Sequence, residues 1–225
     1  MTRAARAVLF DVDGTLVDSN DAHAHAWIDV FREFGREKSI QEIRPLIGMG
    51  GDHLLPTAIG LDHDTPEAEA MGKRRGEIFR TRYLPHLQPF GRVRELLERL
   101  RDDGYTLVVA SSAEDKELHA ILAVTGAADL FTETTSASDA EHSKPSPDIV
   151  EAAVRTTGLD AEQCIMVGDT PYDVEAATRA GVPIVGVGSG GWTADKLAGA
   201  IEVYASVGDI ADTYAVSVFA RRAIG

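Results

Sequence analysis

The chain contains 225 residues, of which 44% are hydrophobic and 26% are charged, a composition typical of a globular protein that buries a sizeable core. The formal net charge of −14 argues against nucleic acid as a main partner, because binding to its backbone needs clustered lysine and arginine. The single Cys164 excludes an internal disulfide, and no apolar run reaches the length of a membrane span. With no signal-like stretch at its start, we expect a cytoplasmic protein that binds neither nucleic acid nor a membrane.

The first part of the chain predicts one strand followed by a helical block. Residues 7–10 are a short apolar run typical of a buried parallel strand. Apolar spacing, capping residues and glycine stops then predict helices over 20–34, from 39 to near 48, over 52–59, and from 66 to about 83. No strand is expected between Leu16 and Leu87.

From residue 88 onward, helices and strands alternate. Strands are predicted over 106–110, 163–167, 183–187 and 201–205, with helices over 92–101, 114–124, 146–157 and 171–180. This alternation indicates an α/β fold with a Rossmann-like, doubly wound parallel sheet. The helical block interrupts the pattern after the first strand. We therefore expect a discontinuous α/β core, residues 1–17 and 88–225, with an all-helical cap at 18–87 inserted into it.

Two carboxylates follow the first strand, in the segment Asp11-Val12-Asp13-Gly14-Thr15. In open α/β sheets, ligands bind at the carboxyl ends of the strands. A simple turn is also compatible with this segment, because Asp bonds to nearby amides and Gly14 permits a positive φ. A calcium loop is disfavoured, because it would place a third oxygen ligand before the glycine.

Polar residues also follow two later strands and precede one helix. These are Ser111 and Ser112, Lys144 before Pro145, and Asp169 with Asp173 four residues beyond it. Taken alone, Lys144 is explained as a solvated loop charge, Ser112 as a helix cap and Asp173 as part of an exposed helix face.

The three acids Asp11, Asp13 and Asp169 are harder to explain in this way. Carboxylates that converge in one crevice repel one another unless a cation lies between them.

In this order, the motifs resemble those of the haloacid dehalogenase superfamily, in the subgroup with a helical cap that includes phosphoglycolate phosphatase and β-phosphoglucomutase. Asp11 to Thr15 match the first motif, Ser111 the second and Lys144 the third. The fourth motif is matched by Gly168-Asp169-Thr170 with Asp173. The order of the motifs is that of the family, and they span the expected core domain from Asp11 to Asp173.

The resemblance implies a role for each catalytic residue. Asp11 would be the nucleophile that forms an aspartyl-phosphate, and Asp13 the general acid and base. Lys144 would offset the charge of Asp11 and the phosphoryl oxygens, and Ser111 would donate a hydrogen bond to one of those oxygens.

The resemblance also implies Mg²⁺ as cofactor. The ion would be held by the Asp11 carboxylate, the Asp13 backbone carbonyl and Asp169, with Asp173 as an indirect or direct ligand. The expected activity is Mg²⁺-dependent hydrolysis of a small phosphorylated metabolite, similar to phosphoglycolate or a sugar phosphate.

The loop from Gly48 to His53 is expected to close over the site. Gly48, Ser112 and His23 are candidate substrate contacts. His23 could instead orient Asp13, and a lone histidine on a mostly apolar helix is also explained as a structural residue.

A sugar-phosphate mutase resembling β-phosphoglucomutase is the main alternative, since Asp18, His23 and Trp27 resemble that branch. A mutase must hold a second phosphate, which Glu114 and Asp115 would repel, so hydrolysis is favoured.

Other members of the superfamily fit less well. The dehalogenase branch lacks the second Asp. A phosphonatase needs a cap lysine that forms a Schiff base, whereas the only lysines at 18–87 are Lys38 and Lys73, and Lys73 is expected in an exposed helix patch. A non-catalytic binding protein is less expected, because neither the nucleophile nor a metal ligand is missing.

The sequence leaves the substrate open, as well as the choice between monomer and homodimer. It assigns no role to residues 216–225. It also leaves open whether Arg44 and the Lys73-Arg74-Arg75 cluster steer anions or face solvent.

Overall fold

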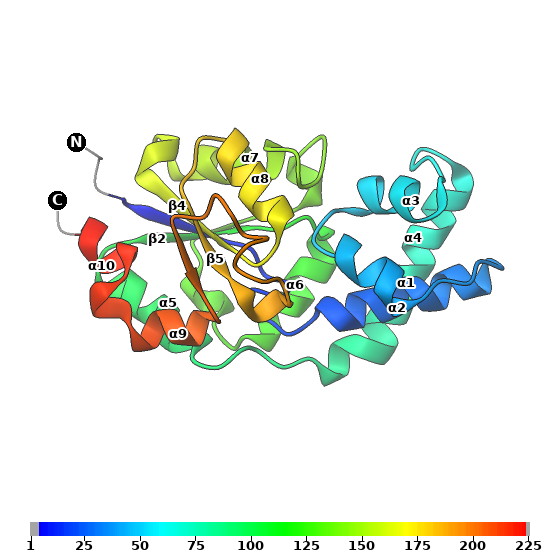
Figure 1. The fold of residues 1–225 in the computed structure, drawn as a ribbon, viewed down its shortest axis with the longest axis horizontal. Helices are drawn as coiled ribbons and strands as arrows, with labels where there is room; N and C mark the ends of the chain where they lie inside the picture. The colour runs from blue at the N-terminus through cyan, green and yellow to red at the C-terminus, as the bar shows by residue number, and fades with distance from the viewer. Residues whose placement is uncertain (1–4, 224–225) are drawn as a thin grey trace.

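A computed structural model describes residues 5–223. Among them, one six-stranded sheet has the strand order β3-β2-β1-β4-β5-β6, and every pair of neighbours is parallel (Figure 1). The strands are β1 (Ala7–Phe10), β2 (Thr106–Ala110), β3 (Glu133–Thr135), β4 (Cys164–Gly168), β5 (Ile184–Val187) and β6 (Glu202–Tyr204). The predicted doubly wound α/β fold is confirmed.

Helices cover both faces of this sheet. Alternate residues of β1 point to opposite faces, with Val8 and Phe10 in one apolar cluster and Ala7 and Leu9 in the other. The first cluster includes residues of α5 (Val93–Asp102), α6 (Asp115–Val124), α9 (Val207–Asp212) and α10 (Val218–Ala223) and continues into residues 18–87; the second includes residues of α7 (Asp148–Thr157) and α8 (Pro171–Arg179). Strands covered on both faces are apolar throughout, which explains the uninterrupted run in β1.

The remaining helices form a separate group beyond the carboxyl ends of the strands (Figure 1). They are α1 (Asn20–Glu33), α2 (Ile40–Ile43), α3 (Gly51–Ile59) and α4 (Pro66–Ile78). We call residues 18–87 the helical block; as predicted, the structure contains no strand there. The helix predicted to reach residue 83 differs in detail, because α4 ends at Ile78 and a π-helical turn, Phe79–Tyr83, follows it. Such turns are rare and frequently lie at functional sites.

The chain enters and leaves the helical block through two adjacent segments. The Asp18 N–H donates to the Gln88 carbonyl over 3.0 Å, and the Phe90 N–H donates to the Leu16 carbonyl over 2.9 Å. Both crossings lie just beyond Asp13, which itself pairs with Val17 in an isolated bridge. The division into a core of residues 1–17 and 88–225 and a cap of residues 18–87 stays a prediction.

The helical block contacts the core directly through hydrogen bonds. The Ser143 N–H donates to Asp52 Oδ2 over 3.0 Å, and the Tyr172 hydroxyl donates to the Pro45 carbonyl over 2.7 Å. A Cβ at Gly50 would lie 2.1 Å from Ser143 Oγ. The loop expected from Gly48 to His53 is shorter than predicted, because α3 begins at Gly51 with Gly50 as its N-cap; the whole segment lies against the core.

The strand β3 was not predicted. It is three residues long, Glu133-Thr134-Thr135, and it lies at the sheet edge, where it pairs only with β2. Short polar edge strands carry no apolar periodicity.

The C-terminal segment from Val216 packs on the core through α10, where the Tyr105 hydroxyl donates to the Phe219 carbonyl over 2.7 Å. Residues 224–225 lie outside the described residues. Across positions 5–223, none of the helices combines the length and apolar character needed to cross a membrane.

Candidate active site

The sheet places three predicted site residues side by side. β1 lies between β2 and β4, so Asp11, Ser111 and Asp169 follow three neighbouring strand ends. A cleft of about 900 Å³ lies between these strand ends and the helical block, and both Asp11 and Asp13 line it. It is therefore the natural place for a small ligand.

A cluster of buried carboxylates lies beside the cleft. Oxygen atoms of Asp11, Asp169 and Asp173 all lie within 4.8 Å of one another. Lys144 Nζ lies 2.7 Å from Asp11 Oδ1 and 2.7 Å from Asp173 Oδ1, and this lysine is fully buried rather than a solvated loop charge. Thr170 also contacts Asp173, through its backbone N–H at 3.0 Å and its hydroxyl at 2.7 Å from Oδ2. Asp173 is thus buried in the site and not on an exposed helix face.

The positive charge of Lys144 does not balance the three carboxyl groups of Asp11, Asp169 and Asp173. Burial raises the pKa of Asp11 to about 7, helped by the nearby charge of Asp173 and opposed by Lys144. Burial and the charges of Asp11 and Asp173 hold the pKa of Asp169 well above its usual value. Burial disfavours the charged form of Lys144, but the two carboxylates outweigh it and raise its pKa. A buried set of oxygen donors with excess negative charge fits a hard divalent metal ion.

Two further side chains hold the carboxylates in place. Thr15 Oγ1 lies 3.1 Å from Asp11 Oδ2 and 3.2 Å from Asp169 Oδ1. Asn20 Nδ2 donates to Asp169 Oδ2 over 2.9 Å. The role of Asn20 was not predicted, because asparagine at the start of a helix already has a local explanation.

The loop after β5 packs directly on Asp169. A Cβ at Gly190 would lie 1.6 Å from Asp169 Oδ2, so only glycine fits there. Ser189 Oγ donates to the Gly14 carbonyl over 2.7 Å. Arg44 of the helical block donates to the Gly190 carbonyl and, over 2.6 Å, to Asp21 Oδ1. Nothing local in the sequence marks this loop as part of the site.

Asp13 lies in a different environment from Asp11. Its Oδ1 accepts a hydrogen bond from the Ser19 hydroxyl and lies 2.8 Å from His23 Nε2. Burial opposes ionisation of Asp13, but the charge and hydrogen bond of His23, together with Ser19 and the charge of Arg75, outweigh it and lower its pKa. The two carboxyl groups therefore have pKa values shifted in opposite directions, because burial dominates at Asp11 and the contacts with His23 and Ser19 dominate at Asp13.

His23 contacts Asp13 and lines the cleft. Its ring is buried and stacks on Phe79 of the π-helical turn, with the ring centroids 4.1 Å apart. Of the roles considered for His23, this geometry favours orientation of Asp13.

The other predicted contacts lie around the same cleft. Ser111 Oγ accepts from the Ala113 N–H over 3.1 Å, which leaves the hydroxyl proton free to donate to a ligand. Ser112 Oγ accepts from the Lys144 N–H over 3.3 Å and so supports the Lys144 segment. Gly48 lines the cleft, and a Cβ there would lie 2.7 Å from the Thr170 methyl group.

The basic cluster of the helical block divides into two parts. Lys73 and Arg75 line the cleft. Arg74 instead forms a bidentate pair with Glu33, at 2.6 and 2.8 Å, on the exposed surface of the block. Arg74 thus has a structural partner away from the cleft.

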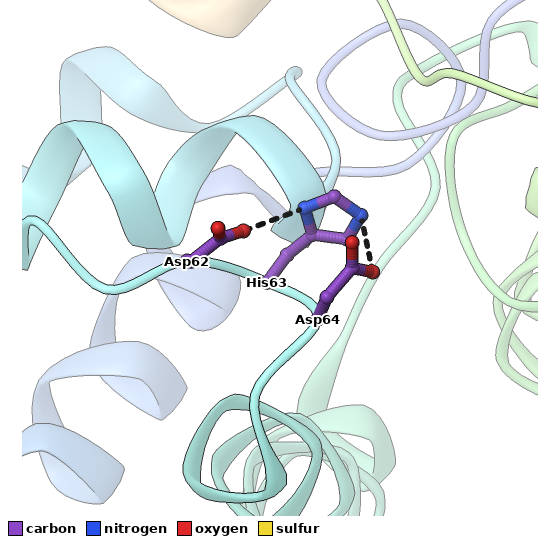
Figure 2. A group of neighbouring side chains, drawn as sticks. All are labelled: Asp62, His63 and Asp64. Atoms are coloured by element: carbon purple, nitrogen blue, oxygen red, sulfur yellow. Dashed lines mark ion pairs between the residues drawn. The ribbon is translucent and has the colours of Figure 1, made fainter.

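A second acidic group, Asp62, His63 and Asp64, lies exposed between α3 and α4. Figure 2 shows the two carboxylates at opposite sides of the imidazole: Asp62 lies 3.5 Å from Nδ1 and Asp64 lies 3.0 Å from Nε2. Each carboxylate lies beside its own ring nitrogen and the three residues are consecutive in the chain, so local contacts explain the group.

Comparison with known proteins agrees with this architecture. A family model described as "Haloacid dehalogenase-like hydrolase" matches residues 8–187. "Probable phosphatase IndB" of Dickeya dadantii is 32% identical over 193 residues, which cover 84% of each chain. "Phosphoglycolate phosphatase" of Aliivibrio fischeri is 29% identical over 185 residues, covering 78% of this chain and 81% of that protein.

Among solved structures, a hydrolase from Pseudomonas syringae matches with a TM-score of 0.86 and 26% identity, over 93% of this chain and 97% of that one. The family match, the curated relatives and the fold agree, and the chain belongs to the haloacid dehalogenase-like hydrolases, as a phosphatase of that family.

Proposed function

We propose that this hydrolase is a Mg²⁺-dependent phosphatase that cleaves a small phosphomonoester through an aspartyl-phosphate on Asp11. The observation that carries the proposal is the position of Asp11: its Oδ1 binds Lys144 at 2.7 Å, and its carboxyl group lies among buried carboxylates that demand a cation. We further propose that the helical block acts as a cap and that the enzyme works in the cytoplasm, as monomer or homodimer.

The proposed residues for Mg²⁺ are the Asp11 carboxylate, the Asp13 backbone carbonyl and Asp169. When bound, the ion would neutralise charge on the nucleophile and on the phosphoryl oxygens. For Asp173 the contacts favour an indirect role, because Lys144 binds one of its oxygens and Thr170 the other.

In the first step, an Asp11 oxygen attacks phosphorus while the bond to the leaving alkoxide oxygen breaks. Asp13 delivers the proton that this oxygen needs, and His23, whose Nε2 lies 2.8 Å from Asp13 Oδ1, holds Asp13 in place. Lys144 and the Ser111 hydroxyl bind the transferred group. In the second step, Asp13 takes a proton from water, the water oxygen attacks the same phosphorus, and the bond to Asp11 breaks to release phosphate.

Backbone amides complete the proposed phosphate site. Within residues 5–223, the N–H groups of Val12 and Asp13 form no hydrogen bond to backbone or side chain. Buried amides are nearly always paired, so free ones beside the nucleophile are available for a phosphoryl oxygen.

The relatives that are named as phosphatases support hydrolysis as the reaction. Glu114 and Asp115 line the cleft next to Ser112. Their carboxylates disfavour a second phosphate there, which a mutase would have to hold.

We expect purified protein to hydrolyse p-nitrophenyl phosphate with Mg²⁺ and to lose this activity when the metal is chelated. Phosphate release is the measurement, and Asp11→Asn protein is the control for contaminating phosphatases. No turnover above that control, with this or any natural phosphate ester, would overturn the proposal. Incubation with β-glucose 1-phosphate tests the mutase alternative: isomerisation to glucose 6-phosphate faster than phosphate release would favour it.

Gly190→Ala should weaken Mg²⁺ binding, by about 10–100-fold, because the added methyl group must displace Asp169. The rise in unfolding temperature on titration with Mg²⁺ measures this directly. Gly188→Ala is the matched control in the same loop, since its Cβ would make an ordinary 3.6 Å contact with the Ala205 carbonyl. Equal Mg²⁺ affinity in both variants would show that the loop does not position Asp169.

A further inference from the structure

A buried carboxylate at the cleft, Glu117, has no part in the proposed chemistry. It lies in the first turn of α6, on the core side, and is only 4% exposed. Arg75 from α4 of the helical block donates to its Oε1. The ion pair thus joins the two sides of the cleft.

Arg75 is held in place by aromatic rings as well as by this ion pair. Its guanidinium lies 5.3 Å from the centre of the Trp27 ring and 5.7 Å from that of Phe79. Phe79 is also the ring on which His23 stacks. Arg75, Phe79 and His23 therefore pack as one unit of the helical block.

Glu117 approaches this unit at His23 as well. Its Oε1 lies 3.9 Å from His23 Nδ1, while Nε2 of the same ring lies 2.8 Å from Asp13 Oδ1. The histidine is thus placed between two carboxylates, one of which is a proposed catalytic group. At 3.9 Å the Glu117 contact is longer than a hydrogen bond, and among the described residues the buried Nδ1 has no hydrogen-bond partner, so Glu117 is the charged group that faces it.

We propose that Glu117, paired with Arg75, is a positioning residue that fixes His23 against Asp13 only when the helical block is docked on the core. The inference rests on the proposed function and deepens it, because it makes the alignment of Asp13 depend on closure of the cleft. Because Arg75 lies on the helical block and Glu117 on the core, undocking separates the pair and removes the constraint on His23. Proton transfer is thereby confined to the closed, water-poor cleft.

The first experiment compares Glu117→Gln and Arg75→Met, which remove one charge each at nearly constant shape. We expect kcat/KM for an alkyl phosphate to fall by about 10²-fold, because a misplaced acid cannot protonate the leaving oxygen. The value for p-nitrophenyl phosphate should fall only a few-fold, since p-nitrophenolate leaves without a proton. A merely structural defect would lower both values equally, and that result would overturn the proposal.

Arg74→Met is the matched control on the same helix, because it breaks the exposed Arg74–Glu33 pair within the helical block. It should change neither rate. The double variant Arg75→Met with Glu117→Gln should be no slower than either single variant, and Arg75→Lys should recover part of the loss. Additive losses, or a loss in Arg74→Met equal to that in Arg75→Met, would contradict the proposed coupling.

A second measurement does not depend on catalysis. The Ser143 N–H donates to Asp52 across the cleft, so its hydrogen exchange reports docking of the helical block. Exchange at this amide should be faster in Glu117→Gln and Arg75→Met than in wild type, and unchanged in Arg74→Met. If wild-type protein hydrolyses no phosphate ester, the proposed function fails while this measurement still tests the ion pair. Unchanged exchange in both variants would show that the Glu117–Arg75 ion pair does not hold the helical block on the core, and would overturn the proposal.

Discussion

Asp11→Asn protein should release phosphate at least about 10⁴-fold more slowly than wild type while remaining folded. The amide has the shape of the carboxyl group but cannot attack phosphorus. Single-turnover measurement of phosphate release with Mg²⁺ gives the rate, and circular dichroism monitors folding. A residual rate within tenfold of wild type would show that Asp11 is not the nucleophile.

The same variant should alter how stability depends on pH in the metal-free protein. The pKa of Asp11 is about 7 in the folded chain, because of burial, against an ordinary value of 3.8. Between these values the folded state binds a proton that the unfolded state has released, so this group makes wild type less stable as pH rises from about 4 to 7. Asparagine lacks this dependence.

The unfolding free energy of Asp11→Asn, relative to that of wild type, should therefore rise as the pH is raised across that interval. Urea unfolding at several pH values without metal measures this difference. Saturating Mg²⁺ should stabilise wild type more than the variant, since the variant has lost a proposed ligand. Parallel stability curves would contradict the assigned pKa shift.

Lys144→Met should have the largest effect on stability among single substitutions in the site. Lys144 is fully buried and its ammonium group lies 2.7 Å from both Asp11 and Asp173. Removal of one partner from a buried ionic group leaves charges uncompensated, at a cost of about 3–5 kcal/mol. Activity should be lost as well, because the transferred phosphoryl group loses its cation.

Thermal and urea unfolding measure this loss of stability. The matched control is Lys38→Met, which removes a lysine from an exposed i,i+4 pair with Glu42 and should leave stability nearly unchanged. If Lys144→Met were as stable as this control, Lys144 would not be needed to compensate the buried charges of Asp11 and Asp173.

The fold and the strand-end residues were predictable for one physical reason. Parallel strands present their carboxyl ends at one edge, so Asp11, Ser111 and Asp169 could be grouped without knowledge of side-chain packing. The apolar run of β1 also indicated a strand buried on both faces. Lys144 was ambiguous, because a lysine before proline carries no sign of burial, and its burial depends on the carboxylates around it.

Contacts between the helical block and the core could not be predicted in this way. Glu117 reads as an ordinary charge in the first turn of a helix, and Arg75 as part of a basic patch. Their pairing depends on how two units dock, and no periodicity within either helix encodes it. The same holds for Gly190, whose close contact with Asp169 arises only when the loop after β5 folds across the end of β4.

The adjacent crossings at Asp18–Gln88 and Leu16–Phe90 have a consequence for how such a protein can diversify. Because the chain leaves and rejoins the sheet unit at neighbouring points, the intervening 70 or so residues behave as an insertion at a single position, and insertions of that kind are well tolerated. The helical block, which we propose acts as a cap, could be lengthened, shortened or exchanged while the register of β1 and the placement of Asp11 remain the same. A change of substrate would then require new sequence on one side of the cleft only.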